Sequence, residues 1–205
     1  FTHIDNEVDV VILRHAKESQ HSKNTTPLLV NSLLKCRIIE GENFSDDPLL
    51  AVLLGTNYAS GDAEFQSADT INQDTENFVH NFLLYPSDKA QVLDEKLVAE
   101  VQSLSKNLQA KPKVRLFLID ATWKKAYRMY MLSENLHQIP HLVLPEGIES
   151  QYRIRKTKKD DALSTLEATV HALALLEQAP EKYEKLLENF VKFNEFQLSY
   201  SQNEF

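Results

Sequence analysis

The sequence predicts an α/β protein with a mainly parallel sheet flanked by helices. Short, nearly unbroken apolar segments recur along its 205 residues and alternate with longer amphipathic segments. Unbroken apolar strands are typical of sheets buried on both faces, and the alternation of strands with helices is typical of parallel sheets. The predicted strands are residues 8–15, 48–56, 78–86, 113–120 and 141–145. The predicted helices are residues 23–37, 94–108, 122–134, 163–178 and 181–197.

The N-terminal part opens with a β-branched strand and a capped helix. Strand 8–15, VDVVILRH, is short and nearly continuous in its apolar character. In the helix that follows, Thr25 or Thr26 can be the N-cap, and Pro27 takes the first helical position. One helical face then carries Leu28, Leu29, Ser32, Leu33 and Cys36.

Glycine and proline delimit the later elements. The apolar run 48–56 is interpreted as a buried strand that ends at Gly55, and Pro86 stops the strand that begins at residue 78. The next helix has Leu97, Val98, Val101 and Leu104 at helical spacing. Pro180 separates the last two predicted helices.

Composition and length restrict the class of protein. A content of 42% hydrophobic and 25% charged residues is ordinary for a globular chain, and 205 residues suit a single domain. No apolar run approaches the roughly 18 residues of a membrane helix, and no signal peptide is visible. The one cysteine, Cys36, excludes an internal disulfide framework and a zinc site built from several thiolates. We therefore expect a cytoplasmic protein.

Charge is unevenly distributed along the chain. The net charge of −8 by itself argues against a nucleic-acid partner. Between Lys111 and Lys159, however, eleven basic residues outnumber four acidic ones, so this stretch carries +7 and the remainder carries −15. Either a polyanion docks on the basic stretch, or the stretch is a solvated face that balances acidic helices elsewhere.

Polar residues follow three predicted strands at the point where each strand ends. The cluster RHAKESQHSKNTT follows the first strand, YPSD follows the strand that begins at residue 78, and DATW follows the strand that begins at residue 113. Ligands of open parallel sheets bind beyond the carboxyl ends of the strands. Three such clusters at one edge of the sheet predict a single site.

Asp120 is the first candidate for chemistry, because a carboxylate at the end of a buried strand is costly unless it is hydrogen-bonded or used. It can instead N-cap the next helix by accepting from the amide of Thr122 or Trp123. Thr122 is interpreted as a cap or a hydroxyl donor. Trp123 shares an apolar helix face with Ala126, Tyr127 and Tyr130, which favours a core position over a ligand platform.

His15, Glu18 and His21 form the second candidate group. Their spacing differs from the metalloprotease pattern, which needs two histidines four residues apart on a helix, so no metal is expected here. Polar contacts to a small ligand, or a helix-entry turn, fit this segment better. Asn24 and Thr25 would extend such a site.

A basic loop supplies the third candidate group. Its candidates are Ser150, Tyr152, Arg155 and Lys156. Functional groups gather in loops, and these cations suit phosphates. Ser164, Thr165 and Glu167 resemble a capping box that would start the following helix. The sequence shows no glycine-rich nucleotide loop, no G-x-S-x-G elbow and no Cys–His nucleophile.

Together these motifs resemble the DTW-domain family, named for a D-x-T-W signature that is found here at residues 120–123. RHAKESQHSKNTTPLL is similar to the family's H-P-x-E…N-T segment, with Ala16 in place of the usual proline. LLYPS resembles its strand-end motif, and SQYRIRKTKKDDALSTLEA resembles its S-x-Y-x-x-R-K…S-T-x-E block. The resemblance covers residues 8–178 of a single domain, with 179–205 as a helical extension. Many relatives carry an N-terminal cysteine cluster, whereas this sequence has only Cys36, so either the subfamily lacks the cluster or it lies before Phe1.

The resemblance implies a SPOUT-like fold, in which a C-terminal trefoil knot holds S-adenosylmethionine. It also implies a tRNA-uridine aminocarboxypropyltransferase, which moves the 3-amino-3-carboxypropyl group of S-adenosylmethionine onto N3 of a tRNA uridine and leaves methylthioadenosine. S-adenosylmethionine is therefore the expected co-substrate, and tRNA is the expected partner. A SPOUT-type RNA methyltransferase and a non-catalytic RNA-binding module are the alternatives.

The resemblance also implies roles for the candidate residues. The expected catalytic residues are Asp120, Thr122 and Trp123. Asp120 would either accept the N3 proton or only orient the base, and Trp123 would stack on a base or on the sulfonium. The expected cofactor contacts are His15, Glu18, Asn24, Thr25, Tyr85, Pro86, Ser150 and Thr165. The expected contacts to tRNA phosphates are Lys124, Arg153, Arg155, Lys156 and Lys158.

Overall fold

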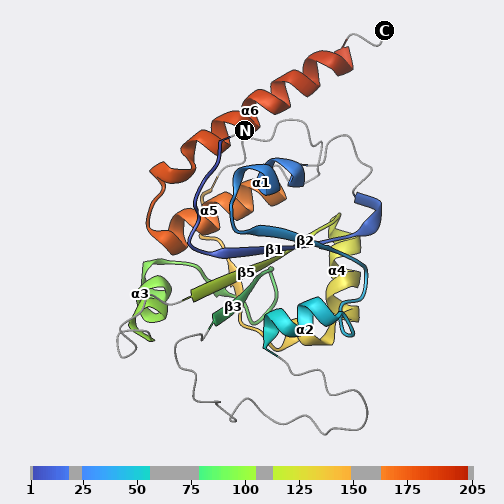
Figure 1. Ribbon diagram of the computed structural model, residues 1–205, viewed down its shortest axis with the longest axis vertical. Helices are drawn as coiled ribbons and strands as arrows, with labels where there is room; N and C mark the ends of the chain where they lie inside the picture. The colour runs from blue at the N-terminus through green and yellow to red at the C-terminus, as the bar shows by residue number, and fades with distance from the viewer. Residues whose placement is uncertain (1, 19–24, 56–78, 105–112, 149–162, 203–205) are drawn as a thin grey trace, which may run out of the picture.

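The computed structural model contains one parallel sheet between two layers of helices (Figure 1). It describes residues 2–18, 25–55, 79–104, 113–148 and 163–202. The strands are β1 (Asp9–Arg14), β2 (Cys36–Glu40), β3 (Val79–Leu84), β4 (Gln91–Val92), β5 (Lys113–Asp120) and β6 (His141–Val143). The helices are α1 (Thr26–Ser32), α2 (Pro48–Leu54), α3 (Glu95–Leu104), α4 (Trp123–Leu132), α5 (Thr165–Glu177) and α6 (Glu181–Gln202), with 3-10 turns η1 (Ala16–Glu18) and η4 (Glu134–His137). The described strands pair in the order β2-β1-β5-β3-β6-β4, and each pairing is parallel.

Alternate residues of the central strands enter two separate cores. In β1, Val10 and Ile12 belong to the first core, whereas Val11 and Leu13 belong to the second, and all four are fully buried. Helices α1, α3, α5 and α6 close the first core, and α2, α4 and η4 close the second. Figure 1 shows α1, α5 and α6 above the sheet and α2 below it. Because both faces are covered, the central strands are unbroken apolar runs in the sequence.

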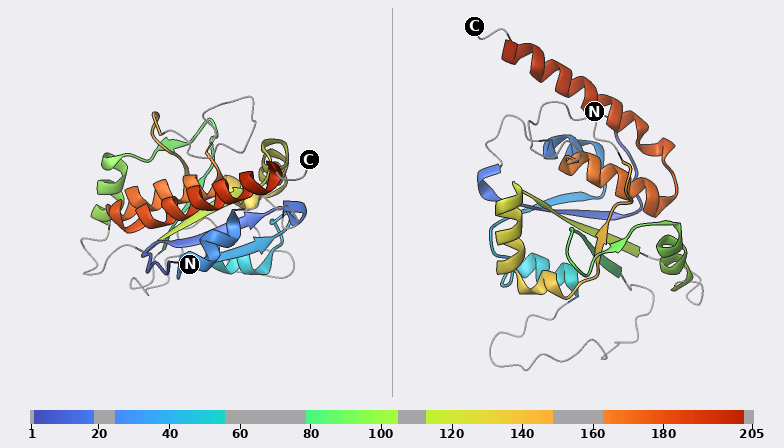
Figure 2. Two further views of the ribbon diagram at one scale, coloured as in Figure 1. Left: turned by 90° about the horizontal axis from the view of Figure 1, so that it is seen from above. Right: turned by 180° about the vertical axis from the view of Figure 1, so that it is seen from behind.

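The structure confirms the α/β class and most of the predicted elements. Four of the five predicted strands correspond to β1, β3, β5 and β6, and four predicted helices correspond to α3, α4, α5 and α6. Strands β2 and β4 were not predicted. Helix α6 buries Tyr183, Leu186 and Phe190 in the first core, and its C-terminal end projects beyond the body of the molecule (Figure 2). None of the described helices is both long enough and apolar enough to cross a membrane.

The segment predicted as a strand at residues 48–56 is instead the helix α2. The Asp47 side chain caps its N-terminus by accepting a hydrogen bond of 2.7 Å from the Leu50 amide, and Pro48 follows in the first turn. Gly55 ends the helix in the left-handed conformation, with φ of 74°. A short apolar run does not distinguish a strand from a buried helix, so the capping residues on either side decide the element.

The helix predicted at residues 23–37 is too long at its C-terminal end. Helix α1 ends earlier, and Cys36 begins strand β2 rather than lying on a helical face. Asn6 holds the connecting turn, because its side chain donates to the Lys35 carbonyl and accepts from the Lys35 amide, both at 3.0 Å. This tertiary contact overrides the helical pattern. Burial, and then the nearby Asp9 carboxylate, raise the pKa of Cys36 to about 12, so its thiol stays protonated.

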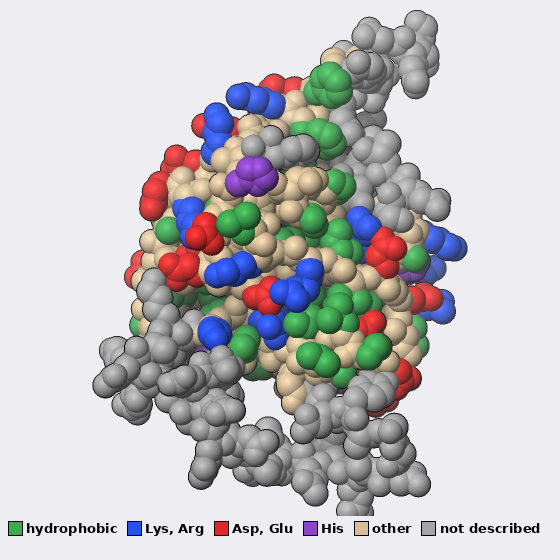
Figure 3. Space-filling model, in the orientation of Figure 1, with side chains coloured by type: hydrophobic (Ala, Val, Ile, Leu, Met, Phe, Trp, Pro, Cys, Tyr) green, Lys and Arg blue, Asp and Glu red, His purple; other side chains and the backbone are tan. Residues whose placement is uncertain are grey.

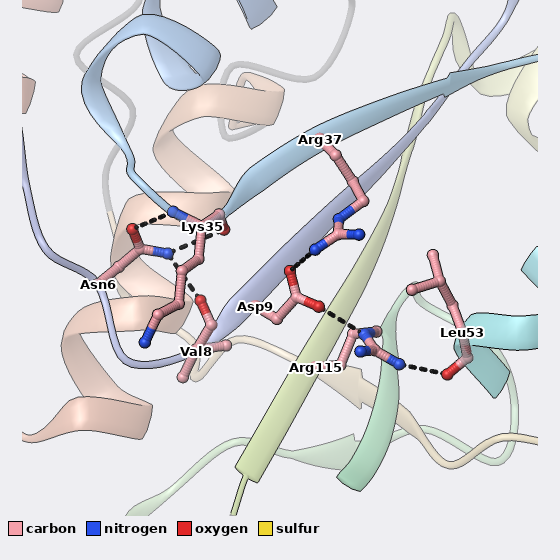
Figure 4. Close-up of polar contacts among 7 residues, drawn as sticks. All are labelled: Asn6, Val8, Asp9, Lys35, Arg37, Leu53 and Arg115. Atoms are coloured by element: carbon pink, nitrogen blue, oxygen red, sulfur yellow. Dashed lines mark hydrogen bonds and ion pairs between the residues drawn. The ribbon is translucent and has the colours of Figure 1, made fainter. Parts of the chain in front are cut away.

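A polar cluster at the amino end of the sheet joins β1, β2, β5 and α2 (Figure 4). Asp9 of β1 accepts from Arg115 of β5 at 2.7 Å and from Arg37 of β2 at 3.2 Å. Arg115 also donates to the carbonyl of Leu53 in α2. The fully buried Asn6 lies beside this cluster. These contacts hold the strands in register at the edge opposite to their carboxyl ends.

Asn6→Ala should lower the free energy of unfolding by about 1–3 kcal/mol, because it leaves the amide and the carbonyl of Lys35 without their side-chain partner. Chemical denaturation followed by circular dichroism measures this change. The exposed neighbour His3 provides a matched control, and His3→Ala should change the same free energy by less than about 0.5 kcal/mol. Equal stability of the two variants would contradict the role assigned to Asn6.

Candidate functional site

The sheet brings the three predicted strand-end clusters together. Strands β1, β5 and β3 are neighbours and run parallel, so their carboxyl ends meet at one edge. The register pairs Arg14 of β1 with Asp120 of β5, and Leu84 of β3 with Leu118 of β5. The polar segments that follow these strands therefore start side by side, as the sequence predicted.

Asp120, the last residue of β5, is held by two hydroxyl groups from two different helices. Thr26 at the start of α1 donates to its Oδ2 at 2.6 Å, and Thr165 at the start of α5 donates to its Oδ1 at 2.7 Å. The backbone carbonyl of Asp120 also accepts from the His15 amide at 3.2 Å. One carboxylate thus ties the end of β5 to the first turns of two helices. We call Asp120, Thr26 and Thr165 the threonine clamp.

The interpretation of Asp120 as the N-cap of the next helix is wrong. Helix α4 begins at Trp123, so Thr122 occupies the N-cap position, and the Thr122 side chain makes no capping hydrogen bond. The Asp120 carboxylate is bonded to the two threonines of the clamp instead. Its partners come from segments 94 and 45 residues away, which local spacing does not reveal.

A capping box fixes the first turn of α5, as the sequence predicted. The Ser164 hydroxyl accepts from the Glu167 amide at 3.2 Å, and the Glu167 carboxylate accepts from the Ser164 amide at 2.8 Å. Thr165 is the first residue of this helix, and its hydroxyl donates to Asp120. The capping box therefore sets the position of one arm of the threonine clamp.

A cavity of about 400 Å³ lies beside the threonine clamp. Its walls come from the ends of β3, β5 and β6 and from the starts of α4 and α5. Most of its lining side chains are apolar, and Ser164 is one of the few that bring a hydroxyl group. The predicted site residues that line it are Tyr85, Pro86, Thr122, Trp123 and Thr165. A mainly apolar cleft with a few polar groups is typical of small-molecule sites.

His15, Glu18 and Thr25 lie on the β1 side of the threonine clamp and do not line this cavity. All three are buried. Glu18 accepts from Lys125 of α4 at 2.7 Å, and His15 Nδ1 accepts from the Lys17 amide at 3.1 Å. Thr25 is the N-cap of α1, without a capping bond from its side chain.

Several predicted site residues lie outside the described part of the chain. They are Asn24, Ser150, Arg153, Arg155, Lys156 and Lys158, together with His21 and Tyr152. Of the cations predicted to contact RNA, Lys124 is described, and it is exposed on α4. Among the residues that the structure describes, no three His, Cys, Asp or Glu side chains are grouped as a metal site requires.

Trp123 is exposed, so the prediction of a core position is wrong. Its exposed fraction is 60%, equal to that of Tyr127 one turn later. Helix α4 packs on the second core through the buried residues Ala126 and Met129. Of the predicted apolar face, Ala126 is therefore buried, whereas Trp123 and Tyr127 are exposed and Met129 takes the second core position. Trp123 lines the cavity and is accessible to a ligand.

An aromatic cluster behind the cavity was not predicted. Tyr85, which lines the cavity, stacks on Tyr130 of α4 with 4.7 Å between the ring centroids. His137 and His141 pack against the Tyr130 ring, at centroid distances of 4.3 and 5.4 Å. These contacts fix the orientation of the Tyr85 ring, and hence one wall of the cavity.

His141 anchors this cluster through hydrogen bonds of both ring nitrogens. Its Nε2 donates to the Leu136 carbonyl at 2.9 Å, so its Nδ1 accepts from the Ser87 hydroxyl at 2.6 Å. Burial lowers the pKa of His141 and raises the pKa of Tyr85, which keeps both rings uncharged near neutral pH. Ser87 belongs to the YPS motif, but its partner lies 54 residues away in the sequence. No spacing rule could have paired them.

Comparison with known sequences then decides the family. The sequence pattern of the DTW domain matches residues 1–198 of this chain. The chain belongs to the DTW-domain family. In this DTW domain, Asp120 of the signature is the centre of the threonine clamp, while Thr122 and Trp123 line the cavity.

Three curated proteins resemble this DTW domain. It is 29% identical over 191 residues to tRNA-uridine aminocarboxypropyltransferase 2 of Drosophila melanogaster, covering 92% of this chain and 64% of that protein. It is 27% identical over 206 residues to tRNA-uridine aminocarboxypropyltransferase A of Arabidopsis thaliana, covering 92% of this chain and 70% of that protein. It is 26% identical over 193 residues to tRNA-uridine aminocarboxypropyltransferase 2 of Macaca fascicularis, covering 92% of this chain and 54% of that protein. The chain therefore spans only part of the length of these relatives. No solved structure matches it.

The stability of this DTW domain should fall as the pH drops below about 6.5. Burial lowers the pKa values of His141, His80 and His171 from the ordinary value of 6.5. Below that value the unfolded chain binds protons that the folded chain does not, so unfolding becomes more favourable. Melting temperatures measured near pH 7.5 and pH 5.5 should show this decline, with a smaller decline in His141→Gln. A decline of equal size in His141→Gln would contradict the neutral buried state of His141.

Proposed function

We propose that this DTW domain transfers the 3-amino-3-carboxypropyl group of S-adenosylmethionine to N3 of a uridine in tRNA. Membership of the family and the names of its relatives support a tRNA uridine as the acceptor. One observation in this chain carries the proposal. The signature residue Asp120 is held by two threonines beside an apolar cavity of ligand size. Methylthioadenosine is the second product.

The cavity suits the adenosyl and sulfonium part of S-adenosylmethionine. Its volume of about 400 Å³ falls within the range of roughly 300–1,000 Å³ for small-molecule sites. The transfer forms a bond between uridine N3 and the γ-carbon, breaks the bond from the γ-carbon to sulfur, and leaves the electron pair on sulfur. The positive charge of the sulfonium disappears in this step. Walls built from side chains such as Leu84, Leu142 and Trp123 exclude water and favour that loss of charge.

Transfer of the longer group, rather than the methyl, requires fixed positions for both reactants. Thr165 both lines the cavity and bonds Asp120, so it connects the cofactor to the threonine clamp. Tyr85 and Pro86 form part of the cavity wall that β3 contributes. The remaining candidates for holding the amino and carboxylate groups are His15, Glu18, Asn24, Thr25 and Ser150.

Asp120 is the group that meets the N3–H of the uridine. Each of its oxygens accepts one threonine hydroxyl and retains the capacity for a further hydrogen bond. The N3 proton must leave as the new bond forms, and Asp120 either takes it or orients the base while water takes it. General-base help from the carboxylate would accelerate the reaction about 10²–10⁴-fold.

Cations close to the site hold the phosphates of the tRNA in this proposal. Lys124 stands next to Trp123 at the start of α4 and is exposed. Contact with tRNA phosphates is also proposed for Arg153, Arg155, Lys156 and Lys158. The basic stretch between residues 111 and 159 would attract the polyanion, whereas the acidic remainder of the chain would repel it.

The proposal extends to a SPOUT-like knot within one DTW domain. Strand β6 follows β5 along the chain but pairs on the far side of β3, and α5 then returns to the end of β5 at Asp120. A knot at this point requires a return of this kind. The residues that connect β6 to α5 include 149–162, which lie outside the described residues. A crystal structure of the complex with S-adenosylmethionine tests this topology.

Incubation with S-adenosylmethionine and unmodified tRNA, followed by nucleoside mass analysis, tests the proposed reaction. The expected product is a uridine heavier by one aminocarboxypropyl group. A gain of one methyl group would indicate the methyltransferase alternative. Cofactor binding without any modified uridine would indicate another RNA, and the absence of cofactor binding would indicate a non-catalytic RNA-binding module.

A set of clamp variants separates proton transfer from positioning. Asp120→Asn alone is ambiguous, because it replaces one of the two accepting oxygens with an NH2 group, which cannot accept from a threonine hydroxyl. Thr26→Val combined with Thr165→Val removes both donors and keeps the carboxylate, whereas the matched Thr→Ser pair keeps both hydroxyls and should stay active. If Asp120 takes the proton, Asp120→Asn should be slower than the double valine variant by about 10²-fold or more. Equal losses would assign Asp120 to positioning.

A further inference from the structure

Three large exposed side chains form a row on the outer face of α4. They are Trp123, Tyr127 and Met131, with exposed fractions of 60%, 60% and 50%. Residues four apart share one face of a helix and rise about 6 Å along its axis, so these side chains are successive neighbours. Single exposed apolar residues are ordinary, but a continuous row indicates a contact surface. We call these three residues the α4 row.

Positive charge accompanies the α4 row along its length. Helix α4 has the sequence WKKAYRMYML, with three cations and no acidic residue. Lys124 is exposed, and Arg128 lies one turn further on with 68% of its side chain accessible although it pairs with Glu42 at 2.9 Å. The two cations form a second row beside the first. In Figure 3, Lys and Arg side chains lie among Asp and Glu side chains at the right-hand edge of the molecule, on the side where Figure 1 places α4.

The α4 row is continuous with the cavity of the proposed site. Its first member, Trp123, lines the cavity and also faces solvent. Helix α4 stands at the edge of the molecule in Figure 1 and in the right-hand view of Figure 2. A chain lying along the row from Met131 toward Trp123 would therefore reach the cavity beside Asp120.

We propose that the α4 row is a stacking platform for unpaired RNA bases next to the target uridine, with Lys124 and Arg128 on the adjoining phosphates. This inference rests on the proposed function. Exposed aromatic rings beside cations are the combination that binds single-stranded nucleic acid, because bases stack on the rings while the cations meet the backbone. The row is too small for a stable protein interface, since three partly exposed side chains provide less than the roughly 800 Å² that each partner buries.

The fluorescence of Trp123, the single tryptophan of the chain, gives a direct reading of base stacking. Titration with unmodified tRNA in the absence of S-adenosylmethionine should quench this fluorescence, and a short single-stranded RNA should quench it more than a duplex of the same composition. Tyr127→Ala should weaken binding about ten-fold or more, and Tyr127→Phe should restore it because the ring is kept. Phe196 of α6 has the same exposed fraction of 60%, so Phe196→Ala is the matched control and should bind as the unaltered chain does.

Either of two binding results would overturn the inference: Tyr127→Ala binds tRNA with unaltered affinity, or no RNA quenches the Trp123 fluorescence. Quenching by duplex RNA that equals quenching by single-stranded RNA would also overturn it. So would a dimer of the unaltered chain that Tyr127→Ala dissociates, because the row would then be a protein interface. Circular dichroism melting confirms that the variants are folded. Because binding is measured without the cofactor, loss of the transferase assignment would leave these results unaffected. Conversely, Tyr127→Ala could modify uridine normally and bind tRNA with unaltered affinity. That result would refute the stacking platform and leave the proposed transferase function standing.

Discussion

The hydrogen bonds from Thr26 and Thr165 to Asp120 are the interaction on which the rest of the site depends. A carboxylate at the end of a central strand needs such partners, because an uncompensated charge there would be costly. The partners come from the first turns of α1 and α5, whose partial positive charge also favours a nearby anion. The clamp therefore joins β5, α1 and α5, which carry three of the four motifs by which this chain resembles the DTW-domain family. It also places the cavity, since Thr165 belongs to both.

The amino and carboxyl ends of the strands, which form two opposite edges of the sheet, carry different kinds of side chain. At the amino edge, Asp9, Arg37 and Arg115 satisfy one another, and Asn6 completes the adjoining turn. At the carboxyl edge, Thr122 and Trp123 line a cavity, and the Thr122 side chain makes no capping hydrogen bond. Stability can thus be maintained at one edge while the other stays open to a ligand. The aromatic cluster around His141 packs against Tyr85 and Tyr130 and so supports the wall of the cavity at this open edge.

Local signals in the sequence predicted the features that depend on neighbouring residues. The apolar strands, the capping box of Ser164 and the meeting of three polar clusters at one edge follow from periodicity and from the rules of parallel sheets. The misassigned element, α2, had its own capping residues, but its apolar run was short enough to resemble a strand. Contacts between distant segments could not be predicted in this way. The partners of Asp120, the Ser87–His141 bond and the exposure of Trp123 all depend on how the helices pack on the sheet.

The central claim is that the site moves the aminocarboxypropyl group, and labelled S-adenosylmethionine tests it most directly. One preparation carries its label in the carboxyl group of the cofactor and a second carries it in the methyl group. After incubation of the intact DTW domain with unmodified tRNA, label in the RNA should come from the carboxyl group and not from the methyl group. Methyl label in the RNA, or carboxyl label that persists when Asp120 and both clamp threonines are replaced, would contradict the account.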